Sequence, residues 1–249
     1  MADKQKKSFA SVNPDVVDAF ISGIDDLRAG LINIDSPHYD DKALTLFLLL
    51  RFHANCSLEF YTNENMLCEL MGLSQRQENK KSIMSNILQM RDDGFLHLRE
   101  NPGNKFFYIV LDYNTFVIDK GFVRIYKEEF EQLLLEKNKD KLILTLYAIK
   151  RFQHNKTEIS FPSMETLVNT ARISKPTLSQ CLDQLAQLFY IYKARIYFHN
   201  GAYKDVNYYK SRSEKNGIDP NTIDTIVKQH YSNVKSIERR NQTDSDDEI

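Results

Sequence analysis

The clearest structural signal in the chain lies in residues 173–185, which read Ile-Ser-Lys-Pro-Thr-Leu-Ser-Gln-Cys-Leu-Asp-Gln-Leu. Ser174 is a residue type that caps helix N-termini, and Pro176 is tolerated in the first helical turn, where its missing N–H is not needed. Apolar side chains then recur at helical spacing, at Leu178, Leu182 and Leu185. The stretch therefore predicts a capped helix that turns three leucines towards a core. The side chains expected to be exposed on its first turns are Lys175, Thr177 and Gln180.

The residues upstream of this helix predict two more helices and a short strand. Ser163 precedes Leu167 in the pattern of a capped helix start, and Ala171-Arg172 forms a tight turn before the next helix. Lys141 to Phe152 is strongly apolar and predicts a helix that supplies most of the core. Glu158 to Phe161 is a short β-prone stretch between these helices.

A β-hairpin is predicted downstream of the same helix. Tyr190–Phe198 and Asp205–Tyr209 flank a loop that contains Asn200-Gly201, a strong short-range hairpin signal. Strand alternation separates the side chains of the first strand into two faces. Lys193, Arg195 and Tyr197 share one face, opposite Ala194, Ile196 and Phe198.

The same order of signals occurs 100 residues earlier. Arg51-Phe52-His53-Ala54-Asn55 aligns with Arg151-Phe152-Gln153-His154-Asn155, and the offset stays constant over about thirty positions, which indicates an internal repeat. The first copy predicts a helix over Lys42–His53, a strand over Leu58–Tyr61 and a helix capped by Asn63. After a turn at Gly72, it predicts a helix that is capped by Ser74 and turns Ile83, Ile87 and Met90 inward. A hairpin of Phe95–Arg99 and Phe106–Leu111 completes the copy.

Helix, short strand, helix, turn, helix and hairpin is the order of a winged helix-turn-helix domain. We therefore expect a mainly α fold with small β-hairpins (α+β), built from two winged helix-turn-helix domains in tandem. The expected organisation is an N-terminal extension (1–40) with a helix from Asp15 to Arg28, a first domain (41–111), a second domain (120–212), and a C-terminal segment (213–249) with a linker, a helix over Thr222–Glu238 and an acidic tail.

Residues 120–210, including Phe122-Val123-Arg124-Ile125-Tyr126, resemble the winged-helix domains of plasmid and phage replication initiators. They are also similar to the amino-terminal domain of the primosome protein DnaD, and these relatives occur in Gram-positive bacteria. Residues 41–111 show the resemblance more loosely. The resemblance implies binding to origin DNA or assembly of replication proteins there, often by a dimer.

The charge of the chain is nearly balanced overall but unevenly distributed along the sequence. The net charge of the chain is −1, yet residues 163–212 hold seven basic and three acidic side chains, a local charge of +4 that could attract phosphates. We find no signal peptide and no apolar run of the roughly 20 residues that a membrane span needs, so a cytoplasmic location without membrane contact is expected.

The sequence also argues against catalysis. The three cysteines have neither metal-like nor redox-like spacing, and the chain lacks a phosphate-binding Gly-rich loop and a His-Glu-x-x-His motif. Paired acids such as Asp92-Asp93 and Glu128-Glu129 lie on predicted helices beside basic residues, as on solvated faces. We therefore expect a protein that is not an enzyme and that needs neither a cofactor nor a metal.

The third helix of each copy is the candidate reader of DNA, because such a helix can enter a major groove about 12 Å wide. Glutamine and asparagine suit adenine edges, and arginine suits guanine. The candidate DNA-binding residues on the two helices are Lys175, Thr177 and Gln180 in the second copy and Gln75, Arg76, Asn79 and Lys80 in the first. The hairpins add Lys193, Arg195 and Lys204 in the second copy and Arg99 and Lys105 in the first.

Three functions fit these patterns. The first is sequence-specific binding of double-stranded DNA by a protein of a plasmid or phage-like element that acts in replication initiation. The second is transcription regulation with the same fold, since site reading uses the same contacts. The third is a non-catalytic adaptor between proteins of a replisome or segregation complex, which the overall charge of −1 favours. The expected partners are duplex DNA, replication proteins and a second copy of the chain.

Overall fold

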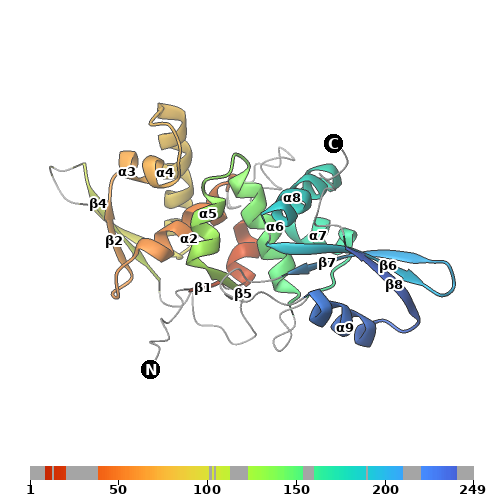
Figure 1. Cartoon of the computed structure of the whole chain (residues 1–249). Helices are drawn as coiled ribbons and strands as arrows, with labels where there is room; N and C mark the ends of the chain where they lie inside the picture. The colour runs from red at the N-terminus through yellow and green to blue at the C-terminus, as the bar shows by residue number, and fades with distance from the viewer. Residues whose placement is uncertain are drawn as a thin grey trace, which may run out of the picture. The chain divides into compact units, whose positions relative to one another are not determined.

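The computed structural model describes residues 9–12, 14–20, 39–100, 103, 105–112, 123–153, 160–188, 190–209 and 220–239. These residues form helices and strands in a mixed α and β structure, as Figure 1 shows. The chain divides into two compact units, Met1–Leu144 and Thr145–Ile249.

The first unit contains, in chain order, β1 (Phe9–Val12), a helical segment over 14–20, α2 (Ala43–His53), β2 (Glu59–Thr62), α3 (Glu64–Leu70), α4 (Gln77–Asp92), β3 (Leu96–Glu100), β4 (Phe107–Leu111), β5 (Val123–Tyr126), α5 (Lys127–Leu133) and the beginning of α6 (Lys139–Arg151). Its larger sheet is antiparallel with the strand order β2-β4-β3. Helices α3 and α4 contact each other, and α4 contacts both β3 and α2. Strand β2 is the third strand of this sheet, and it pairs with β4, the second strand of the predicted hairpin.

Helix α2 is the centre of the core of this unit. Every residue from Ala43 to Leu50 is buried, which fits a helix that is apolar on nearly all sides. Helix α4 turns Ile83, Ile87 and Met90 into the same core, as the spacing predicted. The N-terminal helical segment packs there too, because the Phe20 ring is fully buried and meets the rings of Tyr39, Phe47 and Phe95 edge-on. The rest of the helix expected up to Arg28 lies outside the described residues.

The prediction that Ser74 caps the third helix is wrong. Helix α4 begins at Gln77, and its N-cap is Arg76, which makes no side-chain capping hydrogen bond. The backbone is still extended at Arg76 (φ −70°, ψ 150°), so the helix begins later than expected. Asn79 instead reaches back and donates from Nδ2 to the Ser74 carbonyl at 2.9 Å and to the Ser74 hydroxyl at 3.1 Å.

The division between the two units differs from the expected gap between residues 111 and 120. Strand β5 was expected to open the second domain, yet it pairs with β1 in the first unit, with Phe9 opposite Tyr126 and Val12 opposite Val123. Helix α5 follows in the same unit and buries Phe130, whose ring lies 5.3 Å from that of Phe52. The reason is that β5 finds its partner strand more than 100 residues upstream.

The second unit contains the remainder of α6, then α7 (Met164–Ala171), α8 (Lys175–Gln187), β6 (Ile191–Phe198), β7 (Tyr203–Tyr209), α9 (Pro220–His230) and β8 (Val234–Arg239). Its antiparallel sheet has the strand order β7-β6-β8. The predicted hairpin is confirmed, with Gly201 in its turn at a φ of +83°. The turn before α8 is confirmed as well, since Arg172 ends α7 in the left-handed conformation with a φ of +53°.

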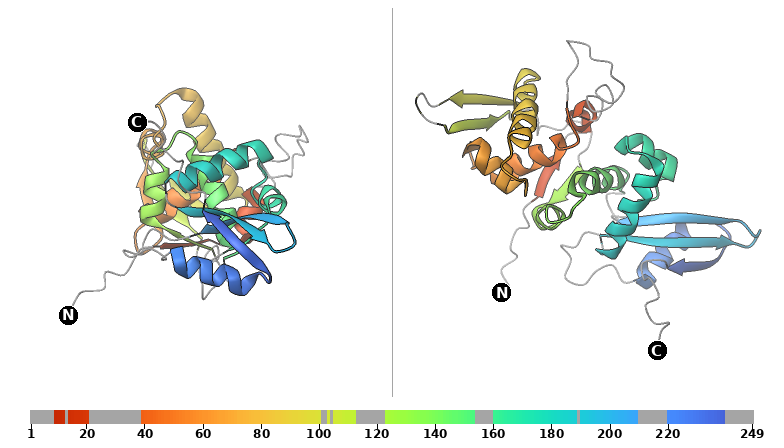
Figure 2. Two further views of the ribbon diagram at one scale, coloured as in Figure 1. Left: turned by 45° about the vertical axis from the view of Figure 1, so that its right-hand side comes forward. Right: turned by 90° about the horizontal axis from the view of Figure 1, so that it is seen from above.

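The helix expected over Thr222–Glu238 is wrong beyond His230. Helix α9 ends at His230, Asn233 turns the chain at a φ of +62°, and the next residues form β8. This strand pairs with β6 along the edge that β7 leaves open. In the views of Figure 2, α9 lies against the sheet, where Val227 packs with Ala194 and Ile196.

Of the strand expected over Glu158–Phe161, the first two residues lie outside the described part of the chain, and the other two, Ser160 and Phe161, are not in a strand. The third strand of this sheet is β8, which comes from the C-terminal side and pairs with the first hairpin strand. In the first unit, β2 comes from the N-terminal side and pairs with the second hairpin strand. The two sheets therefore differ in how they are completed. The linker after residue 212 and the acidic tail lie outside the described residues.

Candidate nucleic-acid interface

Helix α8 presents a polar surface at its N-terminus. Ser174 is its N-cap, as predicted, and the Thr177 N–H donates to the Ser174 hydroxyl at 3.4 Å. The two hydroxyl oxygens of Ser174 and Thr177 lie 2.8 Å apart, so the Thr177 side chain belongs to the cap and is half-buried. Lys175 and Gln180 are exposed, while Leu178, Leu182 and Leu185 are buried as predicted. Of the three candidate residues of this helix, two are therefore on its free surface.

An acidic residue of α8 lies within the candidate interface. The carboxylate of Asp183 accepts a hydrogen bond from the ammonium group of Lys193 on β6. The Asp183 side chain is 56% exposed and the Lys193 side chain 26% exposed, so water reaches both members of the pair. The helix and the hairpin are thus joined by an ion pair one turn beyond Gln180.

The other two cations of the second hairpin also have partners within the unit. The Arg195 guanidinium lies over the Tyr203 ring at 4.4 Å, and the Lys204 ammonium lies 4.9 Å from the centre of the Tyr231 ring. Arg195 is also directly across from Glu238 in the β6–β8 register. Both cations keep their positive charge in these contacts, while the rings restrict where the two side chains can extend.

The predicted alternation along β6 is present. Ala194 and Ile196 are buried against α9, while Lys193, Arg195 and Tyr197 keep part of their surface in solvent. Tyr197 donates its hydroxyl hydrogen to the Glu238 carboxylate at 2.6 Å. The polar face of this sheet is therefore a network of basic, acidic and phenolic groups.

Helix α4 offers a second polar surface in the first unit. Gln75 and Arg76 are exposed, Lys80 is half-buried, and Asn79 is occupied by its hydrogen bonds to Ser74. Lys81, which is not among the predicted DNA-binding residues, is exposed beside Lys80. The Asn-Lys-Lys run at 79–81 was the signal that could have indicated it.

The two cations of the first hairpin lie near the strands of its sheet. Arg99 on β3 is directly across from Tyr108 on β4, and its guanidinium is 3.4 Å from the Glu59 carboxylate. Lys105 is exposed just before β4. Arg99 therefore shares a sheet face with the side chains of Tyr108 and Glu59.

Two ionisable groups of the first unit, Asp140 and Tyr39, have pKa values raised by burial. Burial is the main cause that raises the pKa of the Asp140 carboxyl, while Thr45 and the nearby cations Lys139 and Lys42 act in the opposite direction. Burial and the hydrogen bond to Asp93 raise the pKa of Tyr39 well above its ordinary value.

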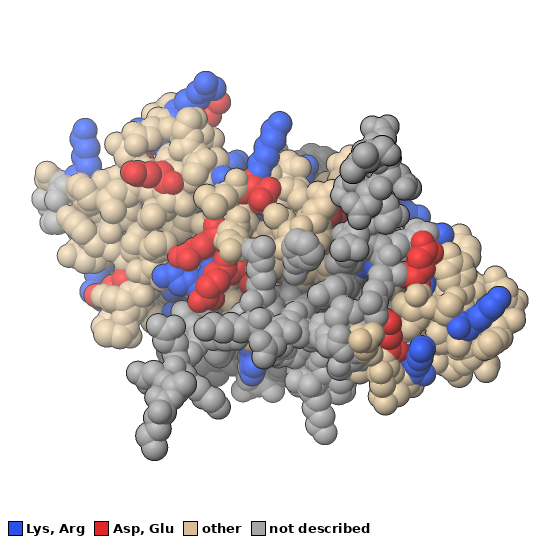
Figure 3. All heavy atoms as spheres, viewed as in Figure 1, with Lys and Arg blue, Asp and Glu red and all other residues tan. Residues whose placement is uncertain are grey.

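The surface charge is mixed. On the face drawn in Figure 3, the described lysine and arginine side chains alternate with acidic ones and do not gather into one basic patch. Among the described residues, no group of three or more His, Cys, Asp or Glu side chains could hold a metal ion. Within the same part of the chain, no helix is both long and apolar enough to cross a membrane.

No protein-family model, curated protein or solved structure matches the chain.

Proposed function

We propose that the chain is a sequence-specific duplex DNA-binding protein built on two winged helix-turn-helix modules. The observation that carries the proposal is the element order that the two units share. A buried helix, a short helix, a turn, a longer helix and a hairpin occur as α2, α3, α4 and β3–β4, and again as α6, α7, α8 and β6–β7. The strand order β2-β4-β3 supports this assignment for the first unit, since it places the N-terminal strand beside the second hairpin strand.

Helix α8 is the better candidate for reading base edges. Lys175 and Gln180 extend from its free side, while its leucines anchor the opposite side. Gln180 can form two hydrogen bonds with an adenine edge, and Lys175 can contact a guanine or a phosphate. Helix α4 is the second candidate, with Lys80 and Lys81 on its first turns and Gln75 and Arg76 just before it.

The resemblance to plasmid and phage replication initiators extends the proposal to replication initiation, with any catalysis supplied by recruited proteins. A regulator of transcription would use the same contacts with DNA. One observation favours an adaptor instead: Lys193, Arg195 and Lys204 all contact partners within the unit. The experiment must therefore distinguish DNA reading from protein assembly.

Selection of bound sites from a pool of random duplexes tests the proposal. The full chain should enrich a defined site, and Gln180→Ala should relax one base position, since a good base-edge contact contributes about 1–3 kcal/mol of discrimination. Gln187→Ala is the matched control, because it removes the same exposed side chain at the far end of the same helix and should leave the site unchanged. Identical preferences for all three proteins would exclude α8 as the reader. No enrichment by the wild type would favour the adaptor.

A further inference from the structure

The outer face of the sheet β2-β4-β3 carries a row of large side chains. Tyr61 on β2 is directly across from Tyr108 on β4, which is directly across from Arg99 on β3. Directly paired residues of antiparallel strands lie on the same face, and all three are exposed. The neighbouring row, which includes Ile109, turns to the opposite face and into the core.

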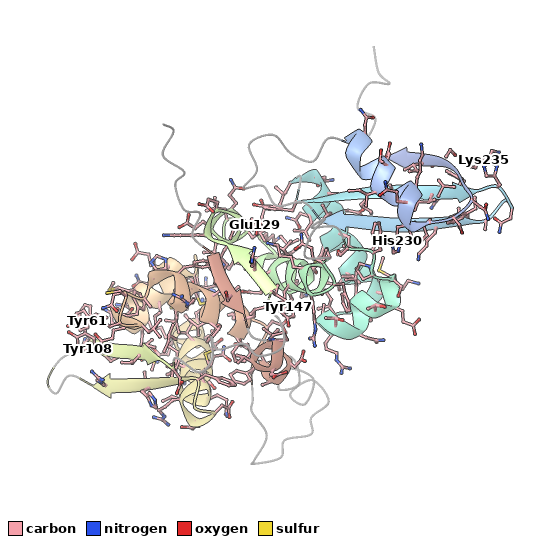
Figure 4. All side chains as sticks on the ribbon, turned by 90° about the horizontal axis from the view of Figure 1, so that it is seen from below. Tyr61, Tyr108, Glu129, Tyr147, His230 and Lys235 are labelled. Atoms are coloured by element: carbon pink, nitrogen blue, oxygen red, sulfur yellow. The ribbon has the colours of Figure 1, made fainter. Side chains whose placement is uncertain are left out.

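Three aromatic rings lie close together on this face. The Tyr61 ring is stacked on the Phe106 ring with centroids 5.0 Å apart and planes 21° apart. The Tyr61 and Tyr108 rings are 4.7 Å apart and tilted by 38°. Figure 4 shows the two tyrosines next to each other on the sheet. Tyr61 is 41% exposed and Tyr108 39% exposed, so solvent reaches both rings.

Two cations border the aromatic array. The Arg99 side chain is 68% exposed, and Lys105 is exposed next to Phe106. Arg99 meets Glu59 at 3.4 Å, but an ion pair between exposed side chains contributes little to stability. The guanidinium can therefore exchange this carboxylate for a phosphate at small cost.

We propose that this outer face binds single-stranded nucleic acid. Unpaired bases stack on Tyr61 and Tyr108, and Arg99 and Lys105 contact the phosphates along the row. Aromatic rings beside a cationic track are the combination that proteins use for single strands, because every base has a face that can stack. A strip with basic residues at its border also fits a polyanion better than the apolar surface of a protein. The proposal goes beyond duplex reading by α8 or α4, because it uses a different surface and a different form of nucleic acid.

The test measures the binding of fluorescein-labelled oligothymidylate and oligouridylate to the full chain by anisotropy. Base stacking contributes about 1–3 kcal/mol per ring, so Tyr61→Ala and Tyr108→Ala should each weaken binding about 5- to 150-fold. Tyr61→Phe and Tyr108→Phe should bind within about twofold of the wild type, because they keep the ring. The ratio of the two oligonucleotide affinities distinguishes a DNA strand from an RNA strand as the ligand.

Three controls make the outcome decisive. Tyr61→Leu and Tyr108→Leu keep apolar bulk without a ring, so they should bind like the Ala variants while retaining more of the wild-type melting temperature. Phe152→Ala removes an equally exposed ring (41%) from the second unit and should leave binding unchanged. Duplex affinity should also be unchanged in every Tyr61 and Tyr108 variant, which separates this proposal from the one above.

The proposal would be overturned if the Leu variants bound single strands as well as the Phe variants, because the contact would then be apolar and not stacked. It would also be overturned if Ala at both tyrosines left the affinity unchanged. That result would show that the two rings do not contact the single strand. Arg99→Gln should reduce the dependence of log K on log salt by about 0.7, the value for one phosphate contact on a single strand.

Discussion

Asp183 provides the sharpest test of whether the second hairpin contacts phosphates. Its carboxylate holds the ammonium group of Lys193, and the side chains are 56% and 26% exposed. Solvent screens such a pair, so it contributes about 0.2–1 kcal/mol. Asp183→Asn should release Lys193 to a phosphate without this cost. Because tenfold in affinity corresponds to about 1.4 kcal/mol, duplex affinity should rise about 1.5- to 5-fold.

The assay is anisotropy of a labelled duplex at several salt concentrations. Each phosphate contact adds about 0.9 to the slope of log K against log salt, so Asp183→Asn should steepen the slope by up to about 0.9. Glu165→Gln is the matched control, because it removes the charge of an exposed acid on α7 of the same unit. The control should leave the slope unchanged.

A double-mutant cycle separates release of Lys193 from a general loss of negative charge. In a Lys193→Ala background, Asp183→Asn should give no gain in affinity and no change in slope. An equal gain in both backgrounds would mean that Asp183 only repels the DNA. An unchanged affinity in the wild-type background would show that Lys193 makes no phosphate contact, and the reasoning about the second hairpin would fail.

Two further predictions concern stability. Leu182→Ala should lower the free energy of unfolding by about 2–5 kcal/mol, because the side chain is 1% exposed and its loss leaves a cavity. Chemical denaturation measures this loss. A loss below about 0.5 kcal/mol would mean that Leu182 is not in the core. Asp140→Asn should raise the melting temperature at neutral pH and have little effect below pH 3.8. The reason is that a carboxyl with a raised pKa contributes stability at low pH, and this stability is lost as the pH rises through its folded-state pKa. Melting curves across pH test this, and a lower melting temperature for the Asn variant at pH 7 would contradict it.

Local patterns in the sequence predicted the helices well. Ile83, Ile87 and Met90 in α4, and Leu182 in α8, follow the helical period, and that period is set by neighbours within one or two turns. The same reasoning predicted that Lys175, Thr177 and Gln180 are exposed, and it was right for Lys175 and Gln180 but wrong for Thr177, whose hydroxyl joins the Ser174 cap. These features depend on short stretches of chain, so a sequence is sufficient to find them.

Long-range pairings could not be predicted in the same way. Strand β8 was expected to be helical, and its partner β6 lies about 40 residues upstream, so no local pattern connects the two. The ion pair of Asp183 with Lys193 depends on how α8 meets β6, and the tyrosine pair on the first sheet depends on the register of β2 with β4. The residue types in the sequence therefore indicated the candidate site, but they did not predict which partners hold each side chain.

Strand β8 also decides how deeply the second hairpin can enter DNA. Neighbouring strands lie about 4.8 Å apart, so three strands span about 10 Å before any side chain is added. The minor groove of B-DNA is about 6 Å wide, which is too narrow for three strands, and the β-ribbon that the major groove admits has two strands. Since β8 pairs with β6 as far as Phe198, only the turn of residues 199–202 extends past the three-stranded width. That turn contains His199, Asn200, Gly201 and Ala202, so insertion there would bring no lysine or arginine to the floor of a groove, and the hairpin would have to follow the phosphate backbone from outside.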